Sequence, residues 1–573
     1  MEQINYLPDN GAMLNAYPDS IGDKLHDMVR FLRQPDLKDI FRSIYILPSL
    51  FNSDLDHGFS LIDYELNELV ATPDDIQELK ELGLVLKLDF VLNHLSVLSN
   101  QFQDILKNGD KSEYRDFFID WNRFWEGNGD ITEQGYIEPD EFLIQNMFFR
   151  KPGLPLLMIR LPDGTDIPYW NTFYQEVCYG QVDAQDLMHA AGMQYTSAVK
   201  LAEVINTALA DGKKPSDIAF GQFKKYAAST ITYLESRRKY LGQMDLNIKS
   251  PKVWKFYADT LSKLAGYGAS IVRLDAFAYA SKEVGARNFF NEPETLDLLR
   301  RMKALADERE IELLPEIHAS YTEKTHEKLA KEGYMVYDFF LPGLIIDALE
   351  RKNVDRLVNW ANELTNKKIR TVNMLGCHDG IPMLDLQGLI PRDEIDSLIQ
   401  IIIDRGGIVK NLHGRKNIYY QVNATYYSAV GEDDNKMLLA RAIQLFMPGK
   451  PQVWYLDLFL GKNNHEAVKQ AGESGHRQIN RTSLSISDID QGLSNDAVRK
   501  QLDMLRFRNT FPAFGFAAEL EIEAPSNHEL VFCWRQHGAR AILCANLQDC
   551  SFSMQGISSA GIVVFSCKVE KSS

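Results

Sequence analysis

The stretch ASIVRLDAFAYASK, residues 269–282, places an arginine and an aspartate two residues apart in a run typical of a buried strand. Side chains alternate between the two faces of a strand, so Arg273 and Asp275 project from the same face. A carboxylate buried alone takes up a proton, whereas a neighbouring guanidinium keeps it ionised. The pair therefore predicts either a structural ion pair inside a core or an ionised carboxylate that can do chemistry.

Further polar side chains stand at or just beyond the ends of other apolar runs that are predicted to be strands. They are Asp56 after residues 43–48, Asn93 and His94 after 84–90, Glu316 within 311–317, and His378 with Asp379 after 370–376. In a barrel of parallel strands, the loops that follow the strands converge on one rim. We therefore expect these side chains to meet at that rim.

Paired carboxylates on neighbouring strands suit glycosyl transfer with retention of configuration. One carboxylate attacks the anomeric carbon, and the other, about 5–5.5 Å away, protonates the leaving oxygen and later deprotonates the acceptor. Asp275 is expected to stay ionised beside Arg273, as a nucleophile requires. Glu316 lies among apolar residues, which should raise its pKa and suit an acid and base. Asp379 would oppose the positive charge of an oxocarbenium-like transition state.

Apolar runs alternate with stretches of helical period along the chain. The predicted strands are 12–17, 43–48, 84–90, 269–275, 311–317, 335–341, 370–376 and 452–458, and the clearest helices are 23–33, 74–82, 251–268, 292–310 and 434–446. Strand–helix alternation predicts a parallel sheet, and eight such units predict an α/β fold of the (β/α)₈ TIM-barrel class.

The gap of residues 91–268 between the third and fourth strands is too long for a loop and predicts an inserted subdomain. We divide the chain into a first part of the barrel (1–95), the insertion (96–245, with extra helices in 178–240), a second part of the barrel (246–512, with a long loop at 377–433) and a small antiparallel C-terminal β domain (513–573).

The composition excludes several classes of function. The net charge is −17, from 62 basic and 79 acidic residues, and because nucleic acids and anionic membranes are bound by basic patches, neither is an expected partner. The start, MEQINYLPDNG, lacks the pattern of a secretory signal, and no apolar run approaches the roughly 18 residues of a membrane helix. The six cysteines show no ligand spacing. We therefore expect a cytoplasmic protein with reduced thiols, no metal and no cofactor.

Four stretches, in this order, resemble the four motifs of glycoside hydrolase family 13, the α-amylase family: DFVLNH (89–94), VRLDAFAY (272–279), LLPEIH (313–318) and MLGCHD (374–379). The resemblance implies Asp275 as the nucleophile, Glu316 as the acid and base, and Asp379 as the group that stabilises the transition state. Amylases that cleave long glucans usually carry Lys-His shortly after the nucleophile. This chain has Ala-Phe-Ala-Tyr there, so such glucans are not the expected substrates.

Further stretches, spread over nearly the whole chain, resemble the sucrose phosphorylase subfamily. Among them are AYPDSIGDKL (16–25), RKPGLP (150–155), CHDGIP (377–382) and INRTS (479–483). The resemblance implies two small-molecule partners, a glucoside and inorganic phosphate, and α-D-glucose 1-phosphate as a product. It also implies that glucose is bound by Asp56, Phe59, His94, Phe173, Arg273, Tyr279, His378 and Arg481.

Phosphate requires a cationic anchor. Arg150 and Lys151 precede Pro-Gly-Leu-Pro, where relatives of this subfamily place a phosphate-binding arginine, although the same two residues would also form an ordinary solvated pair. Further candidates in the long loop are His413, Arg415 and Lys416.

Two features of the function stay open at this level. The loop after Pro382 resembles that of enzymes for sucrose 6'-phosphate or glucosylglycerol, so the leaving group could be fructose, fructose 6-phosphate, glycerol or glycerate. A hydrolase or transglucosylase of the same family, and a non-catalytic sugar-binding relative, are the alternatives. The helices of 178–240 are interpreted as extra packing or as a self-association surface, which would make the protein a homodimer.

Overall fold

The computed structural model describes residues 7–409 and 421–571, so His413, Arg415 and Lys416 lie outside the described residues. The chain forms two compact units. The first, which we call the barrel unit, comprises Met1–Asn93, Ile144–Pro152 and Ile248–Ser573. The second, the inserted unit, comprises His94–Leu143 and Gly153–Asn247.

The barrel unit is built on an eight-stranded sheet with the order β14-β13-β5-β2-β1-β20-β16-β15, and its paired strands run parallel. The strands are β1 (Met13–Ala16), β2 (Ser43–Ile46), β5 (Val85–Val91), β13 (Ala269–Asp275), β14 (Glu312–Pro315), β15 (Val336–Asp338), β16 (Thr371–Met374) and β20 (Lys450–Trp454). The predicted (β/α)₈ fold is confirmed, and all eight predicted strands take part in this sheet.

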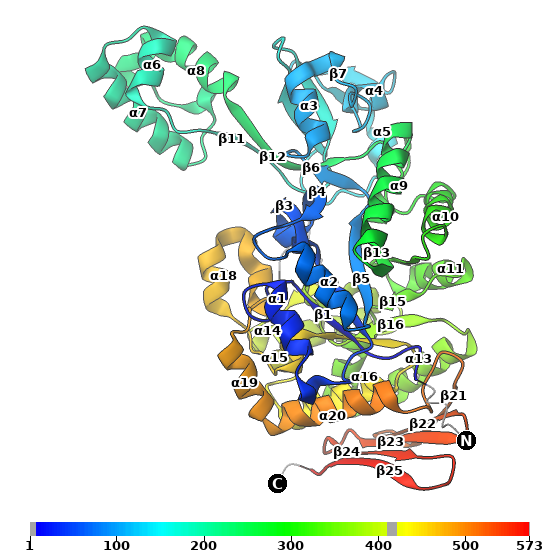
Figure 1. Cartoon of the computed structure of the whole chain (residues 1–573). Coiled ribbons are helices and arrows are strands. Elements are labelled where there is room, and N and C mark those ends of the chain that lie inside the picture. Colours follow the sequence, from blue (N-terminus) through cyan, green and yellow to red (C-terminus); the bar gives the residue numbers. More distant parts are fainter. Residues whose placement is uncertain (1–6, 410–420, 572–573) are drawn as a thin grey trace. The chain divides into compact units, whose positions relative to one another are not determined.

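Amphipathic helices follow the strands and cover the outside of the sheet (Figure 1). They are α1 (Leu25–Leu32), α2 (Pro73–Glu81), α9 (Pro251–Gly266), α10 (Glu294–Asp307), α11 (Thr325–Lys331), α12 (Leu341–Arg351), α13 (Asp355–Asn366), α16 (Asp434–Phe446) and α20 (Asp496–Thr510). Helix α2 shows why such a segment becomes a helix. Thr72 and Asp75 form a reciprocal capping box, and Pro73 occupies the first turn, where its missing N–H costs nothing.

The last predicted strand, 452–458, is wrong in its second half. The strand β20 ends at Trp454, and the chain continues as the short helix α17 (Tyr455–Leu458). Both segments are fully buried, and an apolar run that is buried on all sides has no periodicity that separates strand from helix. In the same way, 335–341 is a strand only over Val336–Asp338, because Leu341 already begins α12.

Strand register determines which side chains meet at the rim. Arg273 of β13 lies opposite Asp89 of β5 on one side and Leu314 of β14 on the other. The guanidinium of Arg273 therefore lies between the strand that carries Asp89 and the strand that leads to Glu316.

The inserted unit contains small antiparallel sheets and a helical part. The ribbon of β11 (Gln175–Tyr179) and β12 (Arg238–Asp245) leads to the helices α6 (Ala184–Ala191), α7 (Tyr195–Ala210) and α8 (Ala227–Ser236) (Figure 1). Leu187, Leu201, Ile205 and Leu234 belong to a hydrophobic core that these helices share among themselves. The predicted helices of 178–240 are therefore a small module with its own core.

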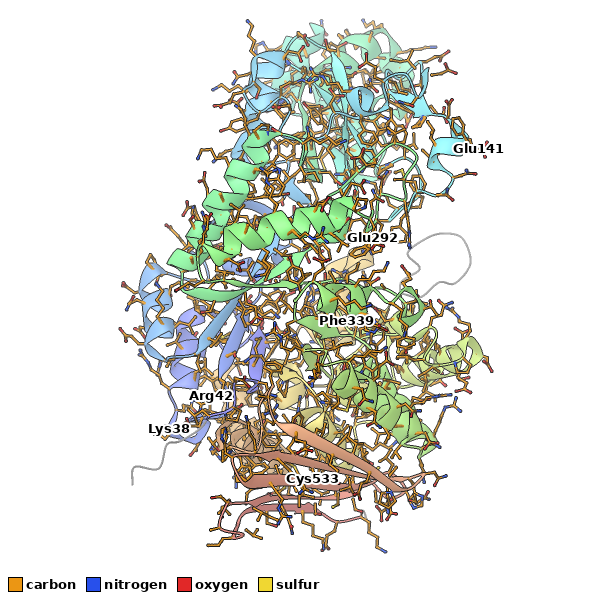
Figure 2. All side chains as sticks on the ribbon, turned by 90° about the vertical axis from the view of Figure 1, so that its right-hand side faces the viewer. Lys38, Arg42, Glu141, Glu292, Phe339 and Cys533 are labelled. Atoms are coloured by element: carbon orange, nitrogen blue, oxygen red, sulfur yellow. The ribbon has the colours of Figure 1, made fainter. Side chains whose placement is uncertain are left out.

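The C-terminal strands form an antiparallel five-stranded sheet, as predicted. They are β21 (Glu519–Ser526), β22 (Glu529–Gln536), β23 (Ala539–Asn546), β24 (Ser551–Ile557) and β25 (Val563–Val569). The Trp534 indole donates to the carbonyl of Phe446 at 2.8 Å, which joins this sheet to the end of α16. All six cysteines are free; Figure 2 shows one of them, Cys533, on this sheet.

Over the residues that the structure describes, no helix is both long and apolar enough to cross a membrane.

The division of the chain into the four segments 1–95, 96–245, 246–512 and 513–573 stays a prediction.

Candidate active site

Arg273 is the centre of a cluster of carboxylates at the ends of β5, β13 and β14. Its Nη1 lies 2.5 Å from Asp89 Oδ1 and 3.1 Å from Asp275 Oδ1, and its Nη2 lies 3.0 Å from Glu316 Oε1. The Arg273 side chain is only 3% exposed, so its charge is compensated by these carboxylates and not by water. One guanidinium thus brings the two predicted catalytic carboxylates, Asp275 and Glu316, to the same place.

Asp89 forms the base of this cluster. It is fully buried, and the hydroxyl of Tyr45 donates to its carboxylate, lying 2.8 Å from Oδ2 and 3.0 Å from Oδ1. Lys87, also fully buried, donates to Tyr337 and Gln452 on other strands of the barrel. Asp89 is therefore a buried structural partner of Arg273 at the base of the cluster.

Glu316 has a second cationic neighbour that the sequence analysis missed. His318 Nε2 lies 3.4 Å from Glu316 Oε1, and its Nδ1 lies 3.3 Å from Asp385 Oδ2. Although burial opposes it, Asp385 and then Glu316 raise the pKa of His318 to about 9, so the imidazole is positively charged at neutral pH. The ring also stacks on Phe339, at 3.8 Å between centroids.

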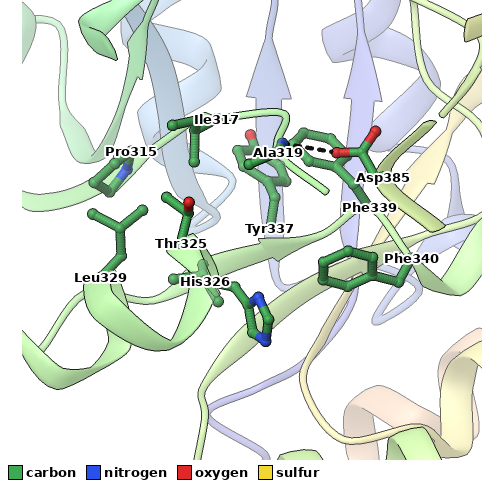
Figure 3. A pocket seen from close by; sticks show the side chains of 11 residues that line it. Pro315, Ile317, Ala319, Thr325, His326, Leu329, Tyr337, Phe339, Phe340 and Asp385 are labelled. Atoms are coloured by element: carbon green, nitrogen blue, oxygen red, sulfur yellow. Dashed lines mark hydrogen bonds between the residues drawn. The ribbon is translucent and has the colours of Figure 1, made fainter. Parts of the chain in front are cut away.

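Asp385 is held in turn by the backbone N–H of Ala319 at 3.1 Å (Figure 3). It also lines a cavity of about 20 Å³ together with Pro315, Ile317, His326 and Phe339. That space is enough for about one water molecule, so the sugar site cannot be this cavity.

The two carboxylates on Arg273 differ in their affinity for a proton. Burial raises the pKa of Asp275 to about 8, although Arg273 acts to lower it, and the charges of Glu316, Asp89 and Asp379 raise it further. For Glu316, burial is outweighed by Arg273 and His318, which lower the pKa to about 2. The surroundings therefore favour the protonated form at Asp275 and the ionised form at Glu316.

This distribution is the reverse of the one predicted from sequence. Leu314 and Pro315 are apolar and adjacent to Glu316 in the chain, but its carboxylate does not lie among apolar groups. It reaches Arg273 of β13 and His318 in the loop after β14. The guanidinium beside Asp275 is shared among three carboxylates and so cannot compensate the burial of each.

Asp379 lies in a second, strongly cationic corner of the site. Its carboxylate is 3.4 Å from Arg481 Nη2, 3.4 Å from Arg477 Nε and 3.3 Å from His378 Nε2. Although burial opposes them, Arg477, His378 and Arg481 hold the pKa of Asp379 far below its usual range. Burial lowers the pKa of His378 to about 3, so that ring is neutral. Asp379 is therefore a permanent negative charge.

Arg477 was missed by the sequence analysis, and it also connects Asp56 to this corner. Its Nη1 lies 2.9 Å from Asp56 Oδ1. The signal was an arginine four residues before Arg481 in HRQINRTS, a spacing that assigns no role by itself.

Two aromatic rings close this part of the site. Phe59 stacks on His378, with 5.1 Å between ring centroids, and the Arg273 guanidinium lies 5.5 Å from the centre of the Phe59 ring. Tyr17 packs edge-on against His378 at 6.2 Å, and Arg481 lies over its ring. The structure thus brings the predicted residues Phe59, His378 and Arg481 together.

The backbone around two of these residues is unusual. Asp56, His57 and Gly58 all have positive φ, and a Cβ at Gly58 (φ 109°) would lie 2.1 Å from the backbone nitrogen of Ser49. Ala276, directly after Asp275, has φ 54°. Residues with a Cβ in this region cost about 1–3 kcal/mol and concentrate at functional sites.

Tyr279 and Arg150 lie beside the carboxylates in the same unit. The Arg150 guanidinium is 5.9 Å from the centre of the Tyr279 ring. Burial raises the pKa of Tyr279, Arg150 opposes this, and the charge of Glu316 adds to it, so Tyr279 lies within the electrostatic range of Glu316. Lys151 is half-buried next to Arg150.

His94 and Phe173 belong to the inserted unit. Their rings lie 4.9 Å apart, and His94 pairs with Asp245 in the ladder between β6 (His94–Ser96) and β12. The structure therefore brings these two predicted residues to each other.

Comparison with known proteins agrees with this arrangement. Residues 35–139 match the model of the α-amylase catalytic domain. The chain is 48% identical to sucrose 6(F)-phosphate phosphorylase of Ilumatobacter coccineus, over 95% of each chain, and 32% identical to the enzyme of that name from Thermoanaerobacterium thermosaccharolyticum, over 96% of this chain and 98% of the relative.

Among solved structures, sucrose 6F-phosphate phosphorylase from Thermoanaerobacter thermosaccharolyticum matches with a TM-score of 0.79 and 31% identity, over 98% of both chains. Each of these matches covers almost the full length of this chain. The chain therefore belongs to the α-amylase family of glycoside hydrolases, and within it to the group of sucrose phosphorylase-like enzymes.

Proposed function

We propose that the protein is a retaining glucoside phosphorylase, a glycosyltransferase-type enzyme that moves the glucosyl group of sucrose or a related α-glucoside to inorganic phosphate and releases α-D-glucose 1-phosphate. The observation that carries the proposal is the placement of Asp275 and Glu316 on the one guanidinium of Arg273, in a chain of the sucrose phosphorylase-like group. Two carboxyl groups close together are what a double displacement at an anomeric carbon requires.

In the first step, Asp275 attacks the anomeric carbon while Glu316 donates its proton to the leaving oxygen. The bond to the leaving group breaks and a covalent β-glucosyl ester with Asp275 forms. In the second step, a phosphate oxygen attacks the same carbon from the opposite face, the ester bond breaks, and Glu316 accepts the proton of the incoming phosphate. The two inversions give net retention.

These steps need a proton on Glu316, whereas the surroundings in the unliganded site raise the pKa of Asp275 and lower that of Glu316. Substrate binding therefore has to reverse this preference between two groups that are both held by Arg273. The hydroxyl groups of a bound glucose would replace lost water around Asp275 and thereby favour its ionised form. Asp379, held ionised by Arg477, would stabilise positive charge at the anomeric carbon.

We propose that the glucose unit is bound by the set of side chains that the sequence predicts. Aromatic rings such as Phe59 would cover its apolar faces, and charged groups such as Arg481 would take its hydroxyl groups. The full set is Asp56, Phe59, His94, Phe173, Arg273, Tyr279, His378 and Arg481.

For phosphate, Arg150 is a better candidate than Lys151. Its guanidinium lies over the ring of Tyr279, and the charge of Glu316 contributes to the raised pKa of Tyr279. A guanidinium can also bind two phosphate oxygens at once. A surface pair with no ligand would not require either side chain to pack on a buried tyrosine.

Among donors, sucrose 6'-phosphate comes first, because the relatives at 48% and 32% identity carry its name. Sucrose, glucosylglycerol and glucosylglycerate follow. We further propose that the protein acts in the cytoplasm without nucleic acid or membrane as a partner, and that it forms a homodimer. A role as a hydrolase or transglucosylase of the same family is the alternative.

A panel of donors tests the proposal. The purified protein is incubated with each of the four donors, with and without phosphate, and glucose 1-phosphate and free glucose are measured. We expect glucose 1-phosphate from at least one donor, only when phosphate is present. Free glucose released at the same rate with and without phosphate would establish the hydrolase instead.

A further inference from the structure

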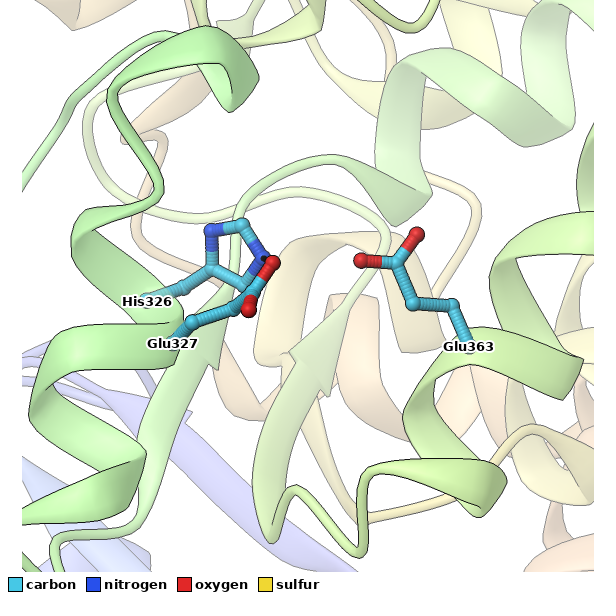
Figure 4. A group of neighbouring side chains, drawn as sticks. All are labelled: His326, Glu327 and Glu363. Atoms are coloured by element: carbon cyan, nitrogen blue, oxygen red, sulfur yellow. Dashed lines mark ion pairs between the residues drawn. The ribbon is translucent and has the colours of Figure 1, made fainter.

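A second group of ionisable side chains lies on the outer helices of the barrel unit, and one of its members, His326, also lines the small cavity beside Asp385. His326 and Glu327 stand on α11, and Glu363 faces them from α13 (Figure 4). One ligand atom of each residue lies within 4.8 Å of the other two. We call these three residues the His326 cluster.

The imidazole of His326 is the unusual member. The residue is 7% exposed, and among the described residues its Nε2 has no hydrogen-bond partner. That nitrogen lies 4.0 Å from Glu327 Oε1, so it points at the carboxylate but is too far away for a hydrogen bond. Buried polar atoms are rarely left unsatisfied, because each costs about 1–3 kcal/mol.

The ring is fixed in this orientation by aromatic neighbours. Phe340 and Trp360 meet it edge-on at 5.2 and 5.6 Å, and Tyr321 stacks on it at 5.7 Å. The hydroxyl of Tyr321 also donates to Glu363 Oε2 at 2.7 Å and orients that carboxylate. A hydrogen bond to a ligand carboxylate of this kind is typical of the second layer around protein metal sites.

Two flexible ammonium groups now neutralise the two carboxylates. Lys367 Nζ lies 2.9 Å from Glu327 Oε1 and 2.8 Å from Glu363 Oε1. Lys324 Nζ lies 3.4 and 3.7 Å from the same two oxygens. Both lysine side chains are more than one third exposed and can turn into solvent. A divalent cation carries the same charge as the two ammonium groups and could also use the imidazole nitrogen, which neither lysine satisfies.

We propose that the His326 cluster binds a divalent transition-metal ion of the Zn²⁺ type, with His326 Nε2, Glu327 and Glu363 as ligands and Lys367 displaced. One imidazole and two carboxylates suit such an ion, whereas Mg²⁺ prefers oxygen ligands alone. In a tetrahedral site with bonds of about 2.1 Å, neighbouring ligand atoms lie about 3.4 Å apart. From a separation of 4.0 Å, the His326 and Glu327 atoms need to close by about 0.6 Å, and the most distant pair of the cluster by up to about 1.4 Å, to reach this geometry. A water molecule would take the fourth position.

The ion would connect α11 to α13 on the outside of the barrel. Its role would be structural, because the cluster shares no residue with the carboxylates around Arg273. The sequence predicted no metal because β15 and α12 separate the ligands along the chain, so no short ligand motif appears.

The test uses the full-length protein after removal of metal with a chelator, and Zn²⁺ is titrated by calorimetry. Four proteins are compared: the natural chain, Glu363→Gln, Lys367→Met and the control Glu323→Gln, which alters a neighbouring surface carboxylate that pairs with Arg287. Circular dichroism confirms that each is folded. The absorption spectrum with Co²⁺ then reports whether thiolates are ligands.

We expect one Zn²⁺ to bind, about 10–100-fold more weakly in Glu363→Gln, more tightly in Lys367→Met because the competing ammonium is gone, and unchanged in Glu323→Gln. The Co²⁺ spectrum should lack a thiolate charge-transfer band. No binding to the natural chain, equal affinity in all four proteins, or a thiolate band would each overturn the proposal.

Discussion

The barrel unit holds two clusters in which carboxylates are paired with cationic side chains, and the two clusters differ in burial and in the number of cations per carboxylate. Around Arg273, one buried guanidinium faces three carboxylates. At the His326 cluster, two half-exposed ammonium groups face two carboxylates. In the first cluster three carboxylates share one guanidinium in a largely buried place, whereas in the second the ammonium groups and the carboxylates are equal in number and the lysine side chains are more exposed.

The pKa values follow this difference. In the Arg273 cluster, burial raises the pKa of Asp275 to about 8 while Arg273 and His318 lower that of Glu316 to about 2, so chemically equal groups are driven apart. In the second cluster, the pKa values of Glu327 and Glu363 are both lowered, with hydrogen bonds from Lys367 as a cause in each. A shortage of cations in a buried place therefore produces an acid–base pair, and a matched exposed cluster does not.

The largest expected effect comes from removing one carboxylate of the buried cluster. Asp275→Asn keeps the size of the side chain but cannot form the glucosyl ester, so we expect phosphorolysis to fall by about 10⁴–10⁶-fold. Release of glucose 1-phosphate from the best donor measures this. Asp259→Asn, on the exposed face of α9, should stay within about twofold of the natural chain. Activity of Asp275→Asn within about tenfold would exclude Asp275 as the nucleophile.

Removing the guanidinium of Arg273 should lower the free energy of unfolding much more than removing a cation of the His326 cluster. Arg273→Met leaves buried carboxylates without their partner, which costs about 3–5 kcal/mol of the free energy of unfolding. Urea denaturation measures the loss. If Arg273→Met and Lys367→Met lost equally small amounts of stability, the contrast between the two clusters would be wrong.

Asp275 and Glu316 should give opposite pH dependences of stability. Asp275, whose pKa is raised, binds a proton in the folded state that the unfolded chain has released, so its contribution is lost as pH rises from about 4 to about 8. Glu316, whose pKa is lowered, contributes above about pH 4, and that contribution is lost as pH falls towards 2. The charges of Arg273 and Asp379 shift the pKa values of both carboxyl groups. Asp89 also acts on Asp275, and His318 also acts on Glu316.

Accordingly, Asp275→Asn should gain stability relative to the natural chain as pH rises through this window, by about 1–3 kcal/mol. Glu316→Gln should lose a similar amount near neutrality, and the loss should shrink on acidification. Urea denaturation across the pH range checks both. If the free energies of unfolding of the two variants changed with pH in the same direction relative to the natural chain, the pKa values of Asp275 and Glu316 would not be shifted in opposite directions.

The smallest effect is expected at the exposed cluster. Lys367→Met, without added metal, removes a half-exposed ion pair whose free energy is about 0–1 kcal/mol. Its unfolding midpoint in urea should lie close to that of the natural chain. A loss comparable to that of Arg273→Met would mean that exposure does not control the strength of these pairs.

Much of this arrangement follows from local sequence. The alternation of strands and helices predicted the barrel, and the positions of Asp275, Glu316 and Asp379 at strand ends predicted the rim. The contacts of Arg477 and His318 could not be predicted, since their partners Asp56, Asp379 and Asp385 are distant in the chain and come close only through loop geometry. The raised pKa of Asp275 could not be predicted either, because it depends on how many carboxylates share Arg273.

The most direct test of the central claim is to trap the covalent intermediate. Glu316→Gln is incubated with α-glucosyl fluoride, whose leaving group needs no acid, and the protein is digested and analysed by mass spectrometry. The account predicts that the peptide containing residues 269–282 gains one anhydroglucose unit on Asp275, and that added phosphate removes this unit as α-glucose 1-phosphate. A label on another carboxylate, or no label while the fluoride is turned over, would contradict it.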